Sequence, residues 1–169
     1  NARHIEANSN RLLHLVNQLL DMAKLESGHM GLDLRHGDLY LTIRDVFERF
    51  LTLAEKSGIK LILHAAPQMP LFDFDAQKVE LVLTNLISNA LKYTPEGGRV
   101  LIHVGGVSTS ADVSVVEIQV SDTGIGIPAE ALPKIFDRFY QVDNGHAGAG
   151  AGTGIGLATV QRVIVRNGG

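Results

Sequence analysis

The order of apolar patterns along the chain predicts an α+β fold, a two-layer α/β sandwich in which helices cover one face of a mixed, largely antiparallel sheet. From residue 32 onward, the patterns follow one another as strand, helix, strand, helix, two adjacent strands, loop and helix. One long amphipathic segment precedes them. We therefore expect two parts, residues 1–30 with a single helix and residues 31–169 with the sheet.

Size and composition exclude several classes of protein. The 169 residues, 45% of them hydrophobic, suffice for one core, and no apolar run reaches the ~18 to 20 residues of a membrane-spanning helix. The net charge of −3, from 15 Lys and Arg against 18 Asp and Glu, predicts no contact with nucleic acid or with a membrane surface. The absence of cysteine excludes disulfides and thiolate metal sites. Because the chain begins at Asn1 without Met, we expect a fragment of a longer protein.

The first segment, residues 3–27, has the spacing of a long amphipathic helix that ends before Gly28 and Gly31. Its apolar positions recur at intervals of three and four and include Ile5, Leu12, Val16, Leu19 and Ala23. Such a seam favours packing in a bundle or coiled coil. The alternative is an ordinary core helix of the same domain.

The remaining elements are defined by periodicity and by residues that begin or end them. Gly58 is expected to end the first helix of this part, Pro67 and Pro70 to close a strand, and Asp75 to cap the next helix. We expect strands at 32–39, 59–65, 99–107 and 112–121, helices at 42–56 and after Asp75, a short helix from Pro133 and a last helix at 157–165.

A turn with the sequence DTGIGIP runs from Asp122 to Pro128, directly after a strand. Gly124 and Gly126 lack a Cβ, so the backbone there can approach a flat ring or a phosphate. Asp122 can accept hydrogen bonds from an exocyclic amine. The alternative is a simple turn whose positive φ angles require glycine.

The helix after Asp75 carries Asn85 and Asn89 four residues apart, hence on one face, and Lys92 and Tyr93 follow one turn later. Amides on an otherwise apolar helix need partners. A polar ligand is one such partner, and a structural hydrogen-bond network or a helix cap is the alternative.

Two further segments complete the pattern. Phe136 and Phe139 are spaced to pack on one side of a helical turn, either as core residues or as a gate. Residues 141–151 are rich in glycine, contain no Lys or Arg, and are expected to form a mobile flap. The loop from Gly152 to Gly156 leads into a helix, where unpaired N–H groups can bind an anion. This loop matches neither the Walker A nor the dinucleotide-binding pattern.

Four segments, in this order, closely resemble the N, G1, F and G2 boxes of the catalytic domain of sensor histidine kinases, which belongs to the GHKL ATPase superfamily. They are NLISNALKYTP at 85–95, DTGIGIP at 122–128, FDRFY at 136–140 and GTGIGLA at 152–158. The resemblance covers roughly residues 40–169 and implies a Bergerat-type ATP-binding fold without its last strands. It also implies that residues 1–30 are part of the second helix of a dimerisation and phosphoacceptor hairpin.

The resemblance implies roles for single residues. Asn89 would supply a carbonyl oxygen to a hydrated Mg²⁺, Lys92 a charge to the phosphates, and Tyr93 an aromatic face beside the nucleoside. Arg138 could reach the γ-phosphate. The implied catalytic residues are Asn85, Asn89, Lys92 and Arg138, and the implied nucleotide-binding residues are Asn85, Asn89, Lys92, Tyr93, Asp122, Gly124, Gly126, Ile127, Gly152, Thr153, Gly154, Gly156 and Leu157.

The resemblance implies a protein histidine kinase that binds Mg²⁺ and ATP. Its hydrolysing relatives carry a Glu where this chain has Asn85, and an amide cannot act as a general base. A response regulator and a second copy of the chain, paired through the N-terminal helix, are the expected partners. The expected location is cytoplasmic, alone or as part of a membrane-anchored sensor. A nucleotide-responsive interaction module and a hydrolysing ATPase are the alternatives.

The phosphoacceptor itself is not expected in this chain. The family marks it with His followed by Glu or Asp and then by Thr or Asn before Pro, and none of the seven histidines fits this pattern. The chain alone is therefore expected to bind ATP without phosphorylating itself.

Overall fold

The computed structural model describes residues 9, 12, 16, 20, 23, 31–65, 71–110, 113–142 and 152–166, with side chains left out at 106–115 and 166. The chain divides into two compact units. One is Asp33–Ile127, and the other comprises Asn1–Leu32 and Pro128–Gly169.

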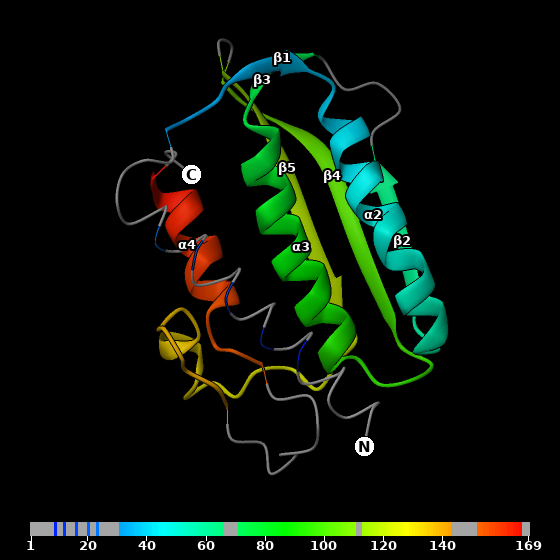
Figure 1. The fold of residues 1–169 in the computed structure, drawn as a ribbon. Coiled ribbons are helices and arrows are strands. Elements are labelled where there is room, and N and C mark those ends of the chain that lie inside the picture. Colours follow the sequence, from blue (N-terminus) through cyan, green and yellow to red (C-terminus); the bar gives the residue numbers. More distant parts are fainter. Residues whose placement is uncertain are drawn as a thin grey trace. The chain divides into compact units, whose positions relative to one another are not determined.

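The unit Asp33–Ile127 contains a mixed three-stranded sheet with the strand order β2-β4-β5 (Figure 1). Strand β2 is parallel to β4, and β5 is antiparallel to β4. A second, two-stranded sheet pairs β1 with β3 in antiparallel register. The elements are β1 Arg35–Gly37, α2 Leu39–Lys56, β2 Lys60–Ala65, β3 Phe72–Phe74, α3 Ala76–Tyr93, β4 Arg99–Ser110 and β5 Val113–Asp122.

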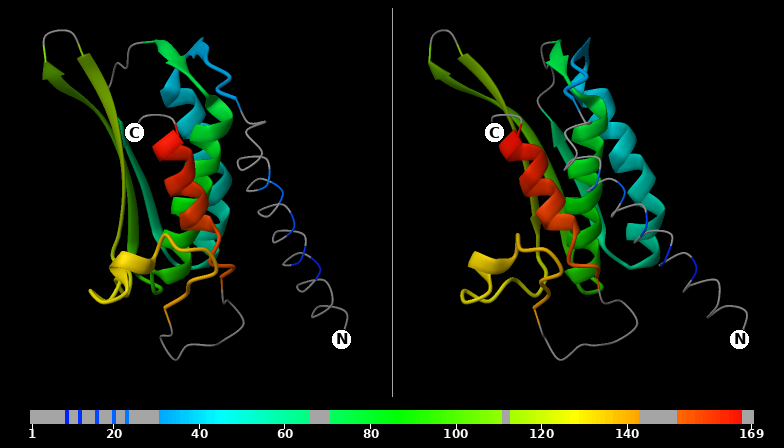
Figure 2. Two further views of the ribbon diagram at one scale, coloured as in Figure 1. Left: turned by 90° about the vertical axis from the view of Figure 1, so that its left-hand side faces the viewer. Right: turned by 60° about the vertical axis from the view of Figure 1, so that its left-hand side comes forward.

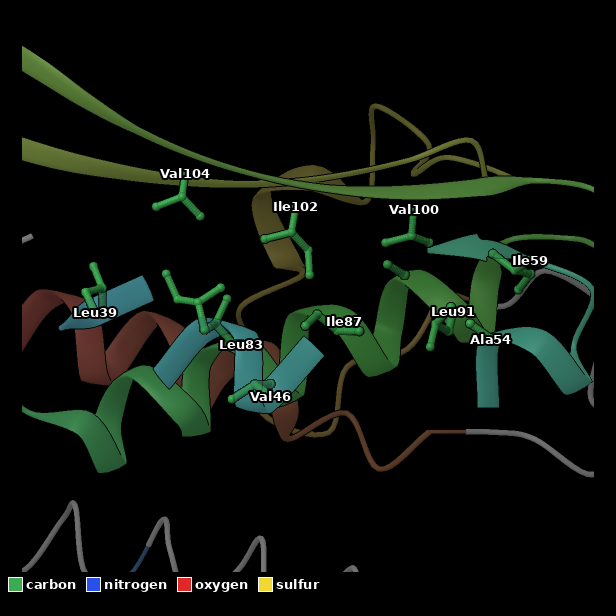
Figure 3. Packing of buried hydrophobic residues seen from close by; sticks show 12 residues of the cluster. Leu39, Val46, Ala54, Ile59, Leu83, Ile87, Leu91, Val100, Ile102 and Val104 are labelled. Atoms are coloured by element: carbon green, nitrogen blue, oxygen red, sulfur yellow. The ribbon is translucent and has the colours of Figure 1, made fainter. Parts of the chain in front are cut away.

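Helices α2 and α3 cover the same face of the β2-β4-β5 sheet (Figures 1 and 2). The core lies between these two helices and the sheet, where Val100, Ile102 and Val104 of β4 are fully buried (Figure 3). They meet fully buried side chains of the two helices, among them Ile43 and Ile87. The structure therefore confirms the predicted α+β sandwich with helices on one face of a mixed sheet.

Both helices of this unit begin at an aspartate cap. Asp38 Oδ1 accepts a hydrogen bond from the backbone N–H of Tyr40 at 2.9 Å, so α2 begins three residues before the predicted start. Asp75 caps α3 as predicted, because its Oδ1 accepts from the backbone N–H of Lys78 at 3.1 Å. At the other end of α2, Gly58 has a φ of 64°, the left-handed conformation expected of a glycine that ends a helix.

Differences from the predicted elements are small and local. The predicted strand at 32–39 is reduced to Arg35–Gly37, and its partner β3 was not predicted. Strand β4 extends closer to the turn than expected, to Ser110, whereas β5 runs from Val113 to Asp122 and so begins and ends slightly later than predicted. The predicted closure of β2 at Pro67 and Pro70 lies outside the described residues.

The other unit contains a 3₁₀ helix at Leu132–Lys134 and the helix α4 at Gly156–Arg166. The first is the short helix predicted at Pro133, and the second agrees with the helix predicted at 157–165. Residues 9, 12, 16, 20 and 23 are helical, whereas the rest of the predicted N-terminal helix and residues 143–151 of the flap lie outside the described residues. In the part of the chain that the structure describes, no helix is both long and apolar enough to span a membrane.

Candidate functional site

The two asparagines of α3 have different surroundings, although both are half-buried. Asn85 Nδ2 donates to the backbone carbonyl of Leu81 at 2.8 Å, one turn earlier. This bond fixes the amide and leaves Oδ1 as its available atom. Within the described residues, the side chain of Asn89 has no hydrogen bond, so a structural network does not account for it.

The end of α3 places a cation beside an aromatic ring. Lys92 and Tyr93 are both exposed, and Lys92 Nζ lies 4.8 Å from the centroid of the Tyr93 ring. At this distance the ammonium interacts with the face of the ring. The last turn of α3 therefore offers a positive charge and an aromatic face on the surface of the unit.

The turn after β5 is attached to this end of α3. The N–H of Ile125 donates to the carbonyl of Tyr93 at 3.2 Å, and a Cβ on Gly124 would lie 2.5 Å from the same oxygen. Only glycine allows so close an approach. Gly126 requires glycine for another reason, because its φ of 71° lies in the left-handed region. The simple-turn interpretation thus explains Gly126, while Gly124 is needed for contact with α3.

Asp122 is the last residue of β5, and its side chain is exposed. Its Oδ1 accepts from the N–H of Gly124 at 2.8 Å, which orients the carboxylate and leaves Oδ2 for a further donor. Thr123 secures the turn on β4, since its Oγ1 accepts from the N–H of Arg99 at 3.0 Å and its own N–H donates to the Arg99 carbonyl at 3.1 Å. This role of Thr123 was not predicted, and the only signal for it in the sequence is the position of Thr123 between Asp122 and Gly124.

A second missed residue is Thr94, which caps the C-terminal end of α3 and is 5% exposed. Its Oγ1 is a buried atom without a hydrogen-bond partner among the described residues. Its methyl carbon lies 2.4 Å from the position that a Cβ on Gly98 would take. The contact explains why glycine occupies position 98, where the chain turns into β4.

The other end of α3 is fixed by Asp75, which is 8% exposed. Its carboxylate accepts from the N–H groups of Lys78 and Asp33 at 3.1 and 3.0 Å, and Lys78 Nζ lies 3.2 Å from Oδ2. Burial alone would raise the pKa of Asp75, but these two backbone hydrogen bonds and the Lys78 ammonium outweigh it and lower the pKa. Asp75 is therefore held as a carboxylate that links Asp33 to the start of α3.

In the other unit, hydrogen bonds connect the FDRFY segment, residues 136–140, and the following Gln141 to the Gly152–Gly156 loop. The N–H of Phe139 donates to the carbonyl of Gly154 at 2.9 Å, and Gln141 Nε2 donates to the carbonyl of Gly152 at 2.7 Å. Gly154 has a φ of 69°, and a Cβ there would lie 2.6 Å from the backbone of Phe139. Phe139 has a φ of 62°, an uncommon value for a residue other than glycine.

The exposure of the two phenylalanines bears on the two alternatives that their spacing allowed. Phe136 is 39% exposed and Phe139 is 63% exposed, so neither is a core residue of the described chain, and the gating role stays a prediction. The reason is local, because the 3₁₀ helix ends at Lys134 and Phe139 has a positive φ, so the two phenylalanines do not lie on one helical turn.

The described structure thus brings together some of the predicted residues. Lys92 and Tyr93 meet the turn Asp122–Ile127, and Asn85 and Asn89 precede them on the same helix. Arg138, Gly152, Thr153, Gly154, Gly156 and Leu157 belong to the other unit. There, Thr153 Oγ1 accepts from the N–H of Ile155 at 3.3 Å, and α4 begins at Gly156.

The residues of α3 suit a hydrated Mg²⁺ better than a metal bound by several side chains. Among the described residues, no group of three or more His, Asp or Glu side chains could hold a metal. Asn89 Oδ1, in a half-buried residue without a described partner, is an oxygen of the kind that a hard cation prefers.

A separate hollow of about 450 Å³ lies on α2 and α3. It contains none of the predicted site residues and is lined by Arg49, Phe50, Gln77, Glu80, Leu81 and Thr84.

Comparison with protein families defines the class. Residues 74–169 match the family described as histidine kinase-, DNA gyrase B- and HSP90-like ATPase. The match covers more than half of the chain and contains all four segments singled out in the sequence. The chain therefore belongs to this family.

Proteins similar to this chain include histidine kinases. Sensor histidine kinase TmoS of Ectopseudomonas mendocina is 36% identical over 160 residues, 95% of this chain and 16% of that protein. The crystal structure of full-length ShkA in complex with AMPPNP is similar with a TM-score of 0.80 and 31% identity, over 95% of this chain and 32% of that one. The crystal structure of histidine kinase ThkA in complex with response regulator protein TrrA is similar with a TM-score of 0.64 and 25% identity, over 81% of this chain and 38% of that one.

These similarities concern a part of larger proteins. The chain spans 11%, 16% and 20% of the length of three curated relatives that it matches. Their names identify a hybrid signal transduction histidine kinase and a sensor histidine kinase among them. The resemblance to sensor histidine kinases that the four segments carry is thereby confirmed.

Proposed function

We propose that this chain binds Mg²⁺ and ATP and is the phosphoryl-donating part of a histidine kinase, which transfers the γ-phosphoryl group to a histidine on a dimerisation helix. The observation that carries the proposal is that Gly124 and Ile125, in the turn after β5, both contact the backbone carbonyl of Tyr93 at the end of α3. It brings an adenine acceptor, a cation and an aromatic ring to one place. Family membership and the AMPPNP named for ShkA support the nucleotide.

Each residue has a role that its geometry permits. Asp122 Oδ2 accepts from the adenine amine, because Oδ1 is already engaged by Gly124. Tyr93 lies beside the nucleoside. The Lys92 ammonium, which contacts the Tyr93 ring, moves away from that ring to pair with phosphate oxygens when a nucleotide binds. Asn89 Oδ1 would hold Mg²⁺, and the bound ion would supply positive charge that offsets the charge of the phosphates.

In the other unit, we assign anion binding to the loop that begins α4. Gly152, Thr153, Gly154, Gly156 and Leu157 present backbone N–H groups at a helix start. Arg138 lies in the segment joined to this loop through Phe139 and supplies a charge for the γ-phosphate. Catalysis then rests on positioning and charge stabilisation by Asn85, Asn89, Lys92 and Arg138.

Two observations favour phosphoryl transfer over hydrolysis. Asn85 is an amide whose nitrogen donates to Leu81, so it cannot take a proton from water. The nearest carboxylate along the helix, Glu80, pairs with Arg49 at 3.0 Å. No general base for water is therefore available at this position of α3.

Assembly and partners are part of the same proposal. Leu12, Val16 and Leu20 are helical and 64%, 43% and 52% exposed, and we propose that this apolar side pairs with a second copy in the complete protein. A response regulator is proposed as the phosphoryl acceptor downstream, since ThkA is named in complex with one. We propose a cytoplasmic location for this part of the protein.

Calorimetric titration with ATP and GTP tests the nucleotide assignment. We expect ATP to bind with the fold intact, and GTP to bind more weakly by about 1 to 3 kcal/mol, the cost of a mispaired hydrogen bond. Asp122→Ala should lose ATP affinity, whereas Gln119→Ala, at an exposed position of the same strand, should not. Equal affinity for ATP and GTP would contradict the assignment.

The same titration with Mg²⁺ and then with a chelator tests Asn89. In the Asn89→Ala variant, the Mg²⁺-dependent part of ATP binding should disappear while adenosine binds as before. An unchanged Mg²⁺ effect would place the metal elsewhere. Incubation with γ-labelled ATP should leave no acid-labile label on this chain alone, because none of its seven histidines has the acceptor pattern.

A further inference from the structure

The face of the β2-β4-β5 sheet that is opposite the helices carries two adjacent histidines. On β2 and β4, the side chains that pack on the core are Leu61, Leu63, Ala65, Val100, Ile102 and Val104. Side chains alternate along a strand, so His64 and His103 lie on the other face. The parallel register pairs His64 directly with His103, and both are exposed. Neighbouring strands lie about 4.8 Å apart, which places the two imidazoles side by side.

The surroundings leave both rings available. His103 Nε2 lies 3.2 Å from the position that a Cβ on Gly105 would take, so the ring occupies space that this glycine leaves open. On the adjoining strand, the register pairs Gln119 with His103 and Glu117 with Gly105, and both are exposed. In the described part of the chain, neither histidine side chain takes part in a hydrogen bond or an ion pair.

We propose that His64 and His103 chelate one divalent transition-metal ion of the Zn²⁺, Ni²⁺ or Cu²⁺ class. Neutral imidazole nitrogens bind these ions at about 2.0 to 2.1 Å, a distance that two rings on paired strand positions can satisfy together. Water molecules complete the coordination. Imidazole is a poor ligand for Mg²⁺, so this site and the nucleotide site select different ions.

The site exists only in the folded chain, because His64 and His103 are 39 positions apart in sequence and are brought together by the β2–β4 register. An ion held by both rings therefore links two strands and stabilises the folded state by mass action. The expected consequence is a melting temperature that rises with Zn²⁺ concentration. The effect does not require ATP.

The experiment is a calorimetric titration of this chain with Zn²⁺ in the presence of excess Mg²⁺. We expect one Zn²⁺ per chain at this site and, for His64→Ala and for His103→Ala, affinity weaker by about tenfold or more, since even outer-shell partners of a metal contribute that much. His36→Ala is the matched control, because His36 is an exposed strand histidine that pairs with Asp73 and not with another histidine. It should bind Zn²⁺ like the unsubstituted chain.

Nuclear magnetic resonance of the unsubstituted chain provides a test that does not depend on the folding of variants. Zn²⁺ should shift the imidazole signals of His64 and His103 and leave those of His36 in place. Absence of Zn²⁺ binding, equal binding by both single variants and the unsubstituted chain, or shifts confined to other histidines would each overturn the proposal. ATP titration of the same samples keeps this result separate from the nucleotide assignment.

Discussion

Helices α2 and α3 are matched in form but differ in what their polar residues do. Each is 18 residues long, begins at an aspartate cap and has a lysine in its last turn. Both contribute fully buried side chains to the same core, such as Ile43 from α2 and Ile87 from α3. Length, capping and amphipathicity therefore do not distinguish α2 from α3, the helix that carries the proposed site.

The difference lies in the environment of their polar groups. On α2, Arg44 lies 3.5 Å from Asp45 and from Glu48, and all three side chains are exposed. On α3, the Asp75–Lys78 pair is buried, and Asn89 is half-buried without a described partner. Helix α3 is also held at both ends, by Asp75 at its start and by the turn at Gly124 and Ile125 at its end. The helix that carries the proposed site is thus held at both of its ends.

The largest expected effect comes from removing the buried cap. Asp75→Ala leaves the Lys78 ammonium, whose side chain is 8% exposed, without its carboxylate, and breaking such a buried pair costs about 3 to 5 kcal/mol. Asp38→Ala on α2 removes an N-cap bond alone and should cost about 1 kcal/mol. Urea unfolding of the two variants measures both free energies. Equal losses would show that the two caps are equivalent.

The ends of the two helices give the second contrast. Gly124→Ala drives a Cβ to 2.5 Å from the Tyr93 carbonyl, a backbone atom that cannot move alone, and should cost about 1 to 3 kcal/mol together with ATP affinity. Gly58→Ala at the end of α2 meets the Glu96 side chain, which can move, and its cost of about 1 to 2 kcal/mol is the strain of a positive φ. Unfolding and ATP titration separate the two. Retained ATP affinity in Gly124→Ala would contradict the role given to the turn.

A smaller effect is expected from protonating Asp75 rather than removing it. Its pKa is lowered in the folded state, so its contribution to stability is fully present above the ordinary aspartate pKa of about 3.9 and is lost as the pH falls through the folded-state value. Asp75→Asn retains a capping side chain that does not titrate. Between neutral pH and about pH 3, the unsubstituted chain should lose more stability than Asp75→Asn in urea unfolding. Parallel losses would assign the acid sensitivity to other groups.

The smallest effect is expected at the ion pair that joins the two helices. Arg49 Nη2 lies 3.0 Å from Glu80 Oε2, but the side chains are 55% and 44% exposed. Pairs of this kind contribute about 0 to 1 kcal/mol, so Arg49→Ala should scarcely change the free energy of unfolding. Thermal unfolding of Arg49→Ala beside Asp75→Ala checks this. A comparable loss in both would mean that exposed and buried pairs matter equally here.

The sequence by itself determined the local features. Periodicity located α2, α3 and α4, Asp75 capped its helix as predicted, and the order of the four segments identified the family. These features depend on residues within a few positions of one another, whose side-chain spacing and backbone preferences are readable along the chain. The three-residue strand Phe72–Phe74 was missed because so short a segment contains no alternation to detect.

Only the tertiary structure decided which distant residues meet. Nothing in the spacing of residues indicates that β2 lies parallel to β4 with His64 beside His103, or that the Tyr93 carbonyl excludes a Cβ at Gly124. It also showed Phe139 to be exposed, which excludes the core packing that was one of the two alternatives for this residue. The physical reason is that strand register and close backbone contacts are fixed by the packing of a shared core, in which residues far apart in sequence must satisfy one another at once.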